Sequence, residues 1–198
     1  MTPVLLLMLA AMGTGPQPIG GSWFSDNDYP QAALVSGRGG AVIVTVTVSP
    51  QGRPTSCEVT RSSGFKPLDQ RSCAVMMRRG QFAPAHDENG GTLTSMFTRQ
   101  INWSVGAPLS VVIPVDMLVN VQHLPAGART QPVGIRQVVG VDGKIESCAI
   151  DESSKLPALD RLACEQAAGF TTVGPAKDAS GASVRTLRVL QVAFADPS

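Results

Sequence analysis

The sequence predicts an α+β fold built from two tandem modules, each with two strands, a helix and a third strand in β-β-α-β order. The chain of 198 residues has only 5% aromatic residues but 20 glycines and 15 prolines, which favours short strands and turns over long helices. Several segments alternate apolar and polar residues, as half-buried strands do. One stretch that begins at Cys57 recurs 91 residues later, at Cys148. We expect each module to be a small antiparallel sheet with one helix packed on a face.

The repeat is clearest between the cysteines. Residues 57–73 have the sequence CEVTRSSGFKPLDQRSC and residues 148–164 have CAIDESSKLPALDRLAC, so two cysteines, a Ser-Ser pair and a Leu-Asp pair coincide. The same offset aligns Gly52 with Gly143. We interpret this as duplication of a whole unit, with residues 106–110 as the natural boundary between the copies.

The four cysteines predict two disulfides, because an even number in an exported chain is typical of a disulfide framework. A duplicated unit should carry its own crosslink. We therefore expect Cys57 to pair with Cys73 and Cys148 to pair with Cys164. A loop of this size stabilises a folded unit by ~3 kcal/mol in the chain-entropy model.

A hairpin opens the first module. Residues 41–48 have the sequence AVIVTVTV, whose alternation predicts a strand with one buried face. Gln51 and Gly52 supply a turn, and residues 55–61, which include Cys57, predict the second strand. These two strands should be antiparallel.

A helix and a third strand complete the module. Pro67 suits the first turn of a helix and Gly80 can end it, so a helix of about three turns is expected between them. Its inward stripe includes Cys73, so the disulfide should join helix and strand. Residues 92–103 predict the third strand.

The second module repeats this order with some divergence. Val46 becomes Gln137 and Phe97 becomes Arg188 at positions expected to face the core or a partner. Residues 111–121 are strongly apolar and could form an additional strand or pack between the modules. The expected strands and helix of the second module are residues 133–141, 144–151, 157–169 and 183–194.

The first residues predict export. An apolar run over residues 4–12 followed by small residues resembles the core and cleavage site of a signal peptide, which we assign to residues 1–15. The run is shorter than the ~20 residues that cross a bilayer as a helix. An uncleaved membrane tether stays an alternative. We interpret residues 16–27 as a short linker, and the modules as residues 28–105 and 106–198.

Composition and motifs argue against several classes of function. A net charge of +1 without a basic block does not favour nucleic acid. Ser63 and Lys66 match a Ser-x-x-Lys pattern, but the second copy has no equivalent lysine. His86 and His123 are the only histidines and no Cys-x-x-Cys spacing exists. We expect no enzyme activity, no metal and no cofactor.

Several short motifs of the first module occur in the order found in a known family. The first copy resembles the C-terminal domain of TonB-family energy transducers, and its paired cysteines resemble a disulfide-bearing subset of that family. The second copy matches only in part and is interpreted as a degenerate copy. The motifs are Tyr29-Pro30-Gln31-Ala32-Ala33, Gly37 and Gly40, Ser62-Ser63-Gly64, Leu68-Asp69 and Phe82-Ala83-Pro84-Ala85.

The resemblance implies a binding mechanism called strand addition. An extended peptide from an outer-membrane receptor would pair with an open edge of the small sheet, with backbone hydrogen bonds supplying much of the attachment. The segment beside the edge and the third strand would then meet the partner. The candidate partner-binding residues are Tyr29, Pro30, Phe97, Arg99, Ile101 and Trp103.

Two functions remain in competition. The first hypothesis is a periplasmic protein-binding module linked to TonB-type transmembrane transport, with the second module as support or as the interface of a homodimer. The alternative is a structural envelope adaptor without energy transduction. The residues between Met12 and Asp28 reach on the order of 50 Å when extended, so we expect a soluble relative that does not transmit force across the envelope. Contact with a membrane would come only through an uncleaved amino terminus or a partner.

Overall fold

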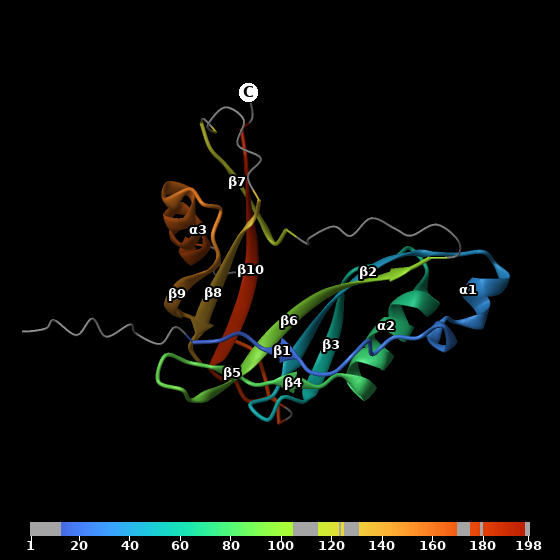
Figure 1. Cartoon of the computed structure of the whole chain (residues 1–198). Helices are drawn as coiled ribbons and strands as arrows, with labels where there is room; N and C mark the ends of the chain where they lie inside the picture. Colours follow the sequence, from blue (N-terminus) through green and yellow to red (C-terminus); the bar gives the residue numbers. More distant parts are fainter. Residues whose placement is uncertain are drawn as a thin grey trace, which may run out of the picture.

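The computed structural model describes residues 13–104, 115–122, 124, 131–169, 175–178 and 180–196. Both halves contribute to one main sheet in the order β3-β2-β6-β10-β8-β9, with β5 beside β6 and β7 beside β10 (Figure 1). The long strands are β2 (Gly40–Val48), β3 (Pro54–Arg61), β6 (Thr92–Trp103), β8 (Val133–Val139), β9 (Ile145–Glu152) and β10 (Thr186–Ala195).

The first half has the predicted β-β-α-β order. β2 pairs antiparallel with β3 on one side and with β6 on the other, and α2 (Lys66–Arg79) packs on one face. Alternate residues of β2 point toward that helix, as a period of two requires. The first core includes Val42, Val44, Val46, Val48, Leu68, Val75, Met76, Phe82, Ile101 and Trp103.

The second half repeats the arrangement with β8, β9, α3 (Pro157–Gly169) and β10. β8 pairs antiparallel with both neighbours. The predicted α+β class with two β-β-α-β halves is confirmed. The second core includes Met117, Val133, Ile135, Leu159, Ala163, Ala167, Val192 and Phe194.

The repeated Ser-Ser and Leu-Asp pairs form the start of each helix. Asp69 accepts hydrogen bonds from the hydroxyls of Ser62 and Ser63 and from the backbone N–H of Ser63. Asp160 accepts the same three bonds in the second half. Burial opposes ionisation of Asp69, but these donors outweigh it and lower the pKa of the carboxyl. The motif therefore serves the fold, as a turn that leads into the helix.

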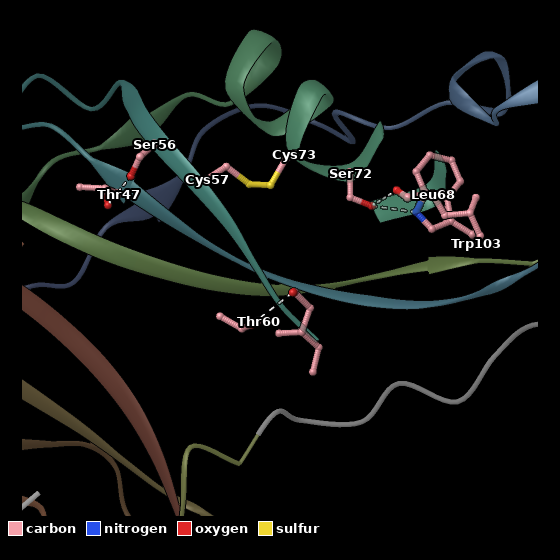
Figure 2. The surroundings of a disulfide bond; sticks show 9 residues. Thr47, Ser56, Cys57, Thr60, Leu68, Ser72, Cys73 and Trp103 are labelled. Carbon is pink, nitrogen blue, oxygen red and sulfur yellow. Dashed lines mark hydrogen bonds between the residues drawn. A yellow bond between two sulfur atoms is a disulfide. The ribbon is translucent and has the colours of Figure 1, made fainter. Parts of the chain in front are cut away.

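Both predicted disulfides are present and join strand to helix. Cys57 of β3 is bonded to Cys73 of α2 with a Cα–Cα distance of 5.6 Å (Figure 2). Cys148 of β9 is bonded to Cys164 of α3 with a Cα–Cα distance of 5.9 Å. The assignment made from the repeat is confirmed.

The two halves are joined by a short parallel pairing that the sequence did not predict. Residues 94–96 of β6 pair with residues 186–188 of β10, which makes the sheet continuous. In this register Leu187 lies beside Ser95 and shares its face of the sheet. That face carries α2 in the first half, whereas α3 packs on the other face of β10 with Val192. The helices therefore cover opposite faces of the sheet.

Short elements lie around this framework. Residues 16–27, predicted to be a linker, include β1 (Gln17–Pro18), which pairs with β4 (Phe82–Ala83), and Trp23, which is part of the first core. Thr14 pairs with His86 of β5 (Ala85–His86), so this histidine lies in a strand. The other short elements are η1 (Asp26–Asp28), α1 (Gln31–Val35) and β7 (Met117–Asn120).

Some predictions fall outside the described residues. This group consists of residues 1–12, which include the apolar run 4–12 of the proposed signal peptide, together with His123 and residues 111–114 of the apolar stretch. The rest of that stretch does form an additional strand, β7. In the part of the chain that the structure describes, no helix is long and apolar enough to span a membrane.

A left-handed residue before each helix gives a test of the local fold. Gly64 has a φ of 82° and its counterpart Lys155 has a φ of 66°. A side chain in this conformation costs ~1 kcal/mol, so Lys155→Gly should raise the free energy of unfolding by about 0.5–1 kcal/mol. Gly64→Lys should lower it by about 1 kcal/mol. Urea unfolding of the oxidised protein measures both, and a destabilising Lys155→Gly would contradict the assignment.

Candidate functional site

A buried carboxylate fixes the segment that leads into the first half. Asp28 is 1% exposed and accepts hydrogen bonds from Arg71 at 2.7 Å and Arg79 at 2.6 Å, both from α2. The backbone and hydroxyl of Ser25 donate to the same carboxylate. Arg79 also donates to the backbone oxygen of Trp23. This cluster, which we call the Asp28 clamp, attaches residues 23–28 to the helix.

The clamp places two aromatic rings on Trp103 at the end of β6. The ring of Tyr29 meets the indole edge to face at 5.3 Å, and the ring of Phe24 does so at 5.7 Å. The hydroxyl of Tyr29 donates to the backbone oxygen of Arg38 at 2.8 Å. Burial raises the pKa of this phenol, so it stays a donor at neutral pH. Gly37, with a φ of 60°, supplies the turn before Arg38.

Trp103 is in turn attached to α2. Its indole N–H donates to the hydroxyl of Ser72 at 2.9 Å, and that hydroxyl donates to the backbone oxygen of Leu68 (Figure 2). Ser72 precedes Cys73, whose disulfide holds the helix to β3. The end of β6 is therefore connected through α2 to the opposite edge of the first half.

A small hollow opens at this position. It has a volume of about 190 Å³ and we call it the aromatic hollow. Phe24, Tyr29 and Trp103 give it apolar walls, while Asp26 and Asn102 contribute polar groups. Its lining residues are Phe24, Ser25, Asp26, Tyr29, Ile101, Asn102, Trp103 and Ser104. A single side chain of a partner would fit a space of this size.

The backbone beside the hollow forms an edge of the sheet. β6 pairs with β10 only over residues 94–96, and β5 pairs with residues 92–93. Within the described ranges, no strand pairs with residues 101–103 on the side away from β2. We call the backbone of residues 101–103 on this side the β6 edge. An edge of this kind can pair with an added strand.

The equivalent edge of the second half is occupied. Val192 lies 91 residues after Ile101, and Phe194 lies 91 residues after Trp103. On β10, residues 192–195 pair in parallel with β7. Among the described residues, the two halves therefore differ at the same structural position, because the edge of β10 carries a strand and the β6 edge has none paired with it.

The divergent residues face each other across neighbouring strands. Val46 pairs with Phe97 in the first half, and Gln137 pairs with Arg188 at the equivalent place. Both polar residues are buried, as expected for this position, and the guanidinium of Arg188 donates to Gln137 at 2.8 and 3.0 Å. Burial lowers the pKa of Arg188. One apolar pair has therefore been replaced by one hydrogen-bonded pair.

The structure brings together only some of the predicted partner-binding residues. Tyr29, Ile101 and Trp103 line the aromatic hollow, although the side chains of Ile101 and Trp103 are largely buried in the first core. Phe97 lines a separate cavity of about 260 Å³ where β6 and β10 diverge. The guanidinium of Arg99 lies 5.7 Å from the ring of Trp23.

Pro30 lies apart from the hollow, at the start of α1, and lines another depression with Arg71. Sequence reasoning missed Phe24 and Asp28. Arg71 and Arg79 lie about two turns apart on α2, and only the fold brings Asp28 to both of them.

Ser63, the serine of the Ser-x-x-Lys pattern, takes part in local hydrogen bonds of the turn before α2. The hydroxyl of Ser63 donates to Asp69 at 2.8 Å and accepts the backbone N–H of Phe65. This serine therefore caps a turn. Among the described residues, no group of three or more His, Cys, Asp or Glu side chains could hold a metal ion.

A family model described as the C-terminal region of the Gram-negative bacterial TonB protein matches residues 25–105. Residues 25–105 are one TonB C-terminal domain. The match begins at residue 25, so the domain includes Asp28, Tyr29 and β6, whereas Phe24 lies immediately before it. No second copy of the family is detected, although the second half shares the order of elements and the disulfide of this domain. No curated protein and no solved structure matches the chain significantly.

The match to this family indicates a class of function for residues 25–105. The family is a non-enzymatic component of transport and implies a TonB-like energy-transduction module. Its members generally bind outer-membrane receptors. The domain and the two disulfides together fit a protein of the periplasm or cell envelope.

The Asp28 clamp predicts a stability difference that depends on pH. Burial alone would raise the pKa of Asp28, but hydrogen bonds from Arg79 and Ser25 outweigh it and hold the pKa far below its ordinary value of 3.8. A depressed folded-state pKa contributes stability that is complete above the unfolded-state pKa and is lost as the pH falls below it. The contribution should therefore decline below pH ~4.

Asp28→Asn should lower the free energy of unfolding by about 2–3 kcal/mol at pH 7, because two partly exposed arginines lose a charged acceptor. Urea unfolding at pH 7 and pH 3 measures this, and the difference from the unmodified protein should shrink at pH 3. The exposed neighbour Asp26→Asn is the matched control and should change stability by less than about 0.5 kcal/mol. Equal effects of the two substitutions would contradict the role of the clamp.

Proposed function

We propose that the TonB C-terminal domain binds an extended segment of a partner protein by strand addition to the β6 edge. The partner is an outer-membrane receptor or another component of TonB-type transmembrane transport. Backbone hydrogen bonds along residues 101–103 would supply attachment, and the aromatic hollow would accept one side chain of the partner.

The observation that carries this proposal is the position of β7. In the second half a short strand lies parallel to β10 at residues 192–195, which correspond to the β6 edge and the residue after it. A β-β-α-β half of this chain can therefore accept a strand at this place. The first half offers the equivalent backbone without a paired strand among the described residues.

The surroundings of the β6 edge support selection of the partner. Phe24 and Tyr29 extend the apolar surface beyond the strand, and Asp26 and Asn102 add polar groups at the rim. Aromatic walls favour an apolar or aromatic side chain of the partner. Because Ile101 and Trp103 point mainly into the core, they contribute backbone and shape more than exposed side chains.

The β6 edge is also connected to the rest of the first half. The indole N–H of Trp103 donates a hydrogen bond to Ser72, and the next residue of α2, Cys73, is joined to β3 by the disulfide. A partner attached to β6 would thus be connected to both edges of the first half.

One observation favours this function over a structural envelope adaptor. An adaptor could have its sheet edges covered by the second half. Instead, β10 covers only residues 94–96 of β6 and then diverges toward β7 (Figure 1). The contact between the halves leaves the β6 edge uncovered by β10.

The test is a binding titration of the oxidised protein with peptides from the amino termini of outer-membrane receptors. A binding peptide should slow hydrogen exchange at the amides of residues 101–103 and leave β3 unchanged. Two N-methylated versions of that peptide are compared, one methylated at the odd-numbered residues and the other at the even-numbered residues. Because only every second amide of an added strand faces the sheet, the comparison separates backbone pairing from side-chain docking. Strand addition predicts that one version loses at least about tenfold in affinity, ~1.4 kcal/mol, while the other binds nearly as before.

Tyr29→Ala should weaken binding about tenfold because it removes one wall of the hollow, whereas Tyr29→Phe should retain affinity within about threefold. Tyr29→Phe is the matched control, since it removes only the hydroxyl that binds Arg38. Binding that tolerates both N-methylated peptides, or no binding by any receptor peptide, would favour the structural adaptor.

A further inference from the structure

β7 is a short strand of the main sheet with one exposed face. It has four residues, Met117–Asn120, and its only strand partner in the part of the chain that the structure describes is β10. Met117 is 6% exposed and belongs to the second core, whereas its neighbour Leu118 is 63% exposed. Val119 again packs against the core. The strand therefore has an inward face with two apolar side chains and an outward face that contacts little.

The attachment of β7 combines this apolar packing with backbone pairing to β10. The N–H of Asp116 donates to the oxygen of Gln191, the carboxylate of Asp116 accepts the N–H of Gln191, and the N–H of Val121 donates to the oxygen of Ala195. These bonds lie at the two ends of a parallel register from Met117 to Asn120. A peptide with the same backbone and the same inward side chains could make the same contacts.

We propose that the second half holds a second strand-acceptor site on β10, and that β7 is a resident ligand of this site supplied by the chain itself. The site consists of the backbone edge of residues 192–195 and the core surface beneath Met117 and Val119. Its external ligand would be an extended peptide that runs parallel to β10 and presents apolar side chains at alternate positions. Such a peptide binds when β7 leaves.

Three features make release of β7 feasible. The paired segment is short, its outward face is exposed, and Met117 is its one buried side chain among the described residues, with Val119 partly buried beside it. Short strands with few buried contacts are the segments that open locally while the rest of a fold persists. The second half has further connections of its own, because β8 pairs with both β9 and β10 and the disulfide joins β9 to α3.

A tethered strand has a strong advantage over a free peptide. Its effective concentration at the site is in the millimolar range for a short connection, so a peptide in solution competes poorly with it. The unmodified protein should therefore bind such a peptide weakly at β10. Replacement of Met117, the buried side chain of β7, should release the strand and expose the site on β10. This inference concerns β10 alone and does not depend on whether the β6 edge binds a receptor.

The probe is a synthetic peptide with the sequence of residues 115–122, Val-Asp-Met-Leu-Val-Asn-Val-Gln. The full-length protein with Met117→Asp should bind it at least about tenfold more tightly than the unmodified protein does, because its own strand no longer competes. Leu118→Asp is the matched control, since it introduces the same charge one residue away on the exposed face. It should bind no more tightly than the unmodified protein.

Hydrogen exchange identifies the edge that is occupied. Peptide bound to the Met117→Asp protein should protect the amides of residues 192–195, whereas binding at the β6 edge would protect residues 101–103. Met117→Ala is the second variant, because a smaller side chain keeps the second half folded while it weakens the anchor. Met117→Ala should bind the probe peptide several-fold more tightly than the unmodified protein does, and the bound peptide should protect the same amides, those of residues 192–195.

Both disulfides and the circular dichroism of each variant are checked before titration. If both Met117 variants are folded and bind the peptide no better than Leu118→Asp, β7 is a structural strand and the proposal is wrong. Protection confined to residues 101–103 in every variant would also overturn it. That second result would leave the proposed function of the first half intact, so failure of one idea is distinguishable from failure of the other.

Discussion

The arrangement of this protein depends on the parallel pairing of residues 94–96 in β6 with residues 186–188 in β10. Three residues on each strand merge two antiparallel sheets into one, and their register places α2 and α3 on opposite faces. A small third core of Ala85, Leu93, Val138 and Leu187 closes the junction. Because the pairing is so short, the strands diverge beyond it and the later part of β6 is not covered by β10.

The two halves share an order of elements but differ in their details. In the first half a cross-strand pair of Val46 and Phe97 continues the apolar core, and the β6 edge lies beside an aromatic hollow. In the second half the equivalent pair is polar and buried, and the edge carries β7. The half whose edge has no paired strand among the described residues is also the half that the TonB family model matches. This agreement links sequence similarity to the structural feature that strand addition needs.

Rigidity around the β6 edge comes from contacts between distant parts of the chain. The Asp28 clamp holds Phe24 and Tyr29 against Trp103, and the bond from Trp103 to Ser72 ties the strand to a helix that is already crosslinked to β3. An edge held in this way is organised before a partner arrives, so less conformational entropy is lost on binding. The second edge is organised differently, since β7 occupies it until it is displaced.

The elements of each half and both disulfides could be predicted from the sequence, because strand alternation, helix-start residues and a repeated cysteine spacing are local signals. For Gln137 and Arg188 the sequence left two environments open, the core or a partner, and the structure shows both side chains buried. The sequence could not show that the halves share one sheet, because strand pairing across about ninety residues leaves no periodic signal. Only the folded chain shows that β7 pairs with the edge of β10, that Ile101 and Trp103 turn their side chains inward, and that Phe24 and Asp28 lie close to Trp103 and Tyr29. Those facts depend on which distant surfaces meet, and no local pattern records that choice.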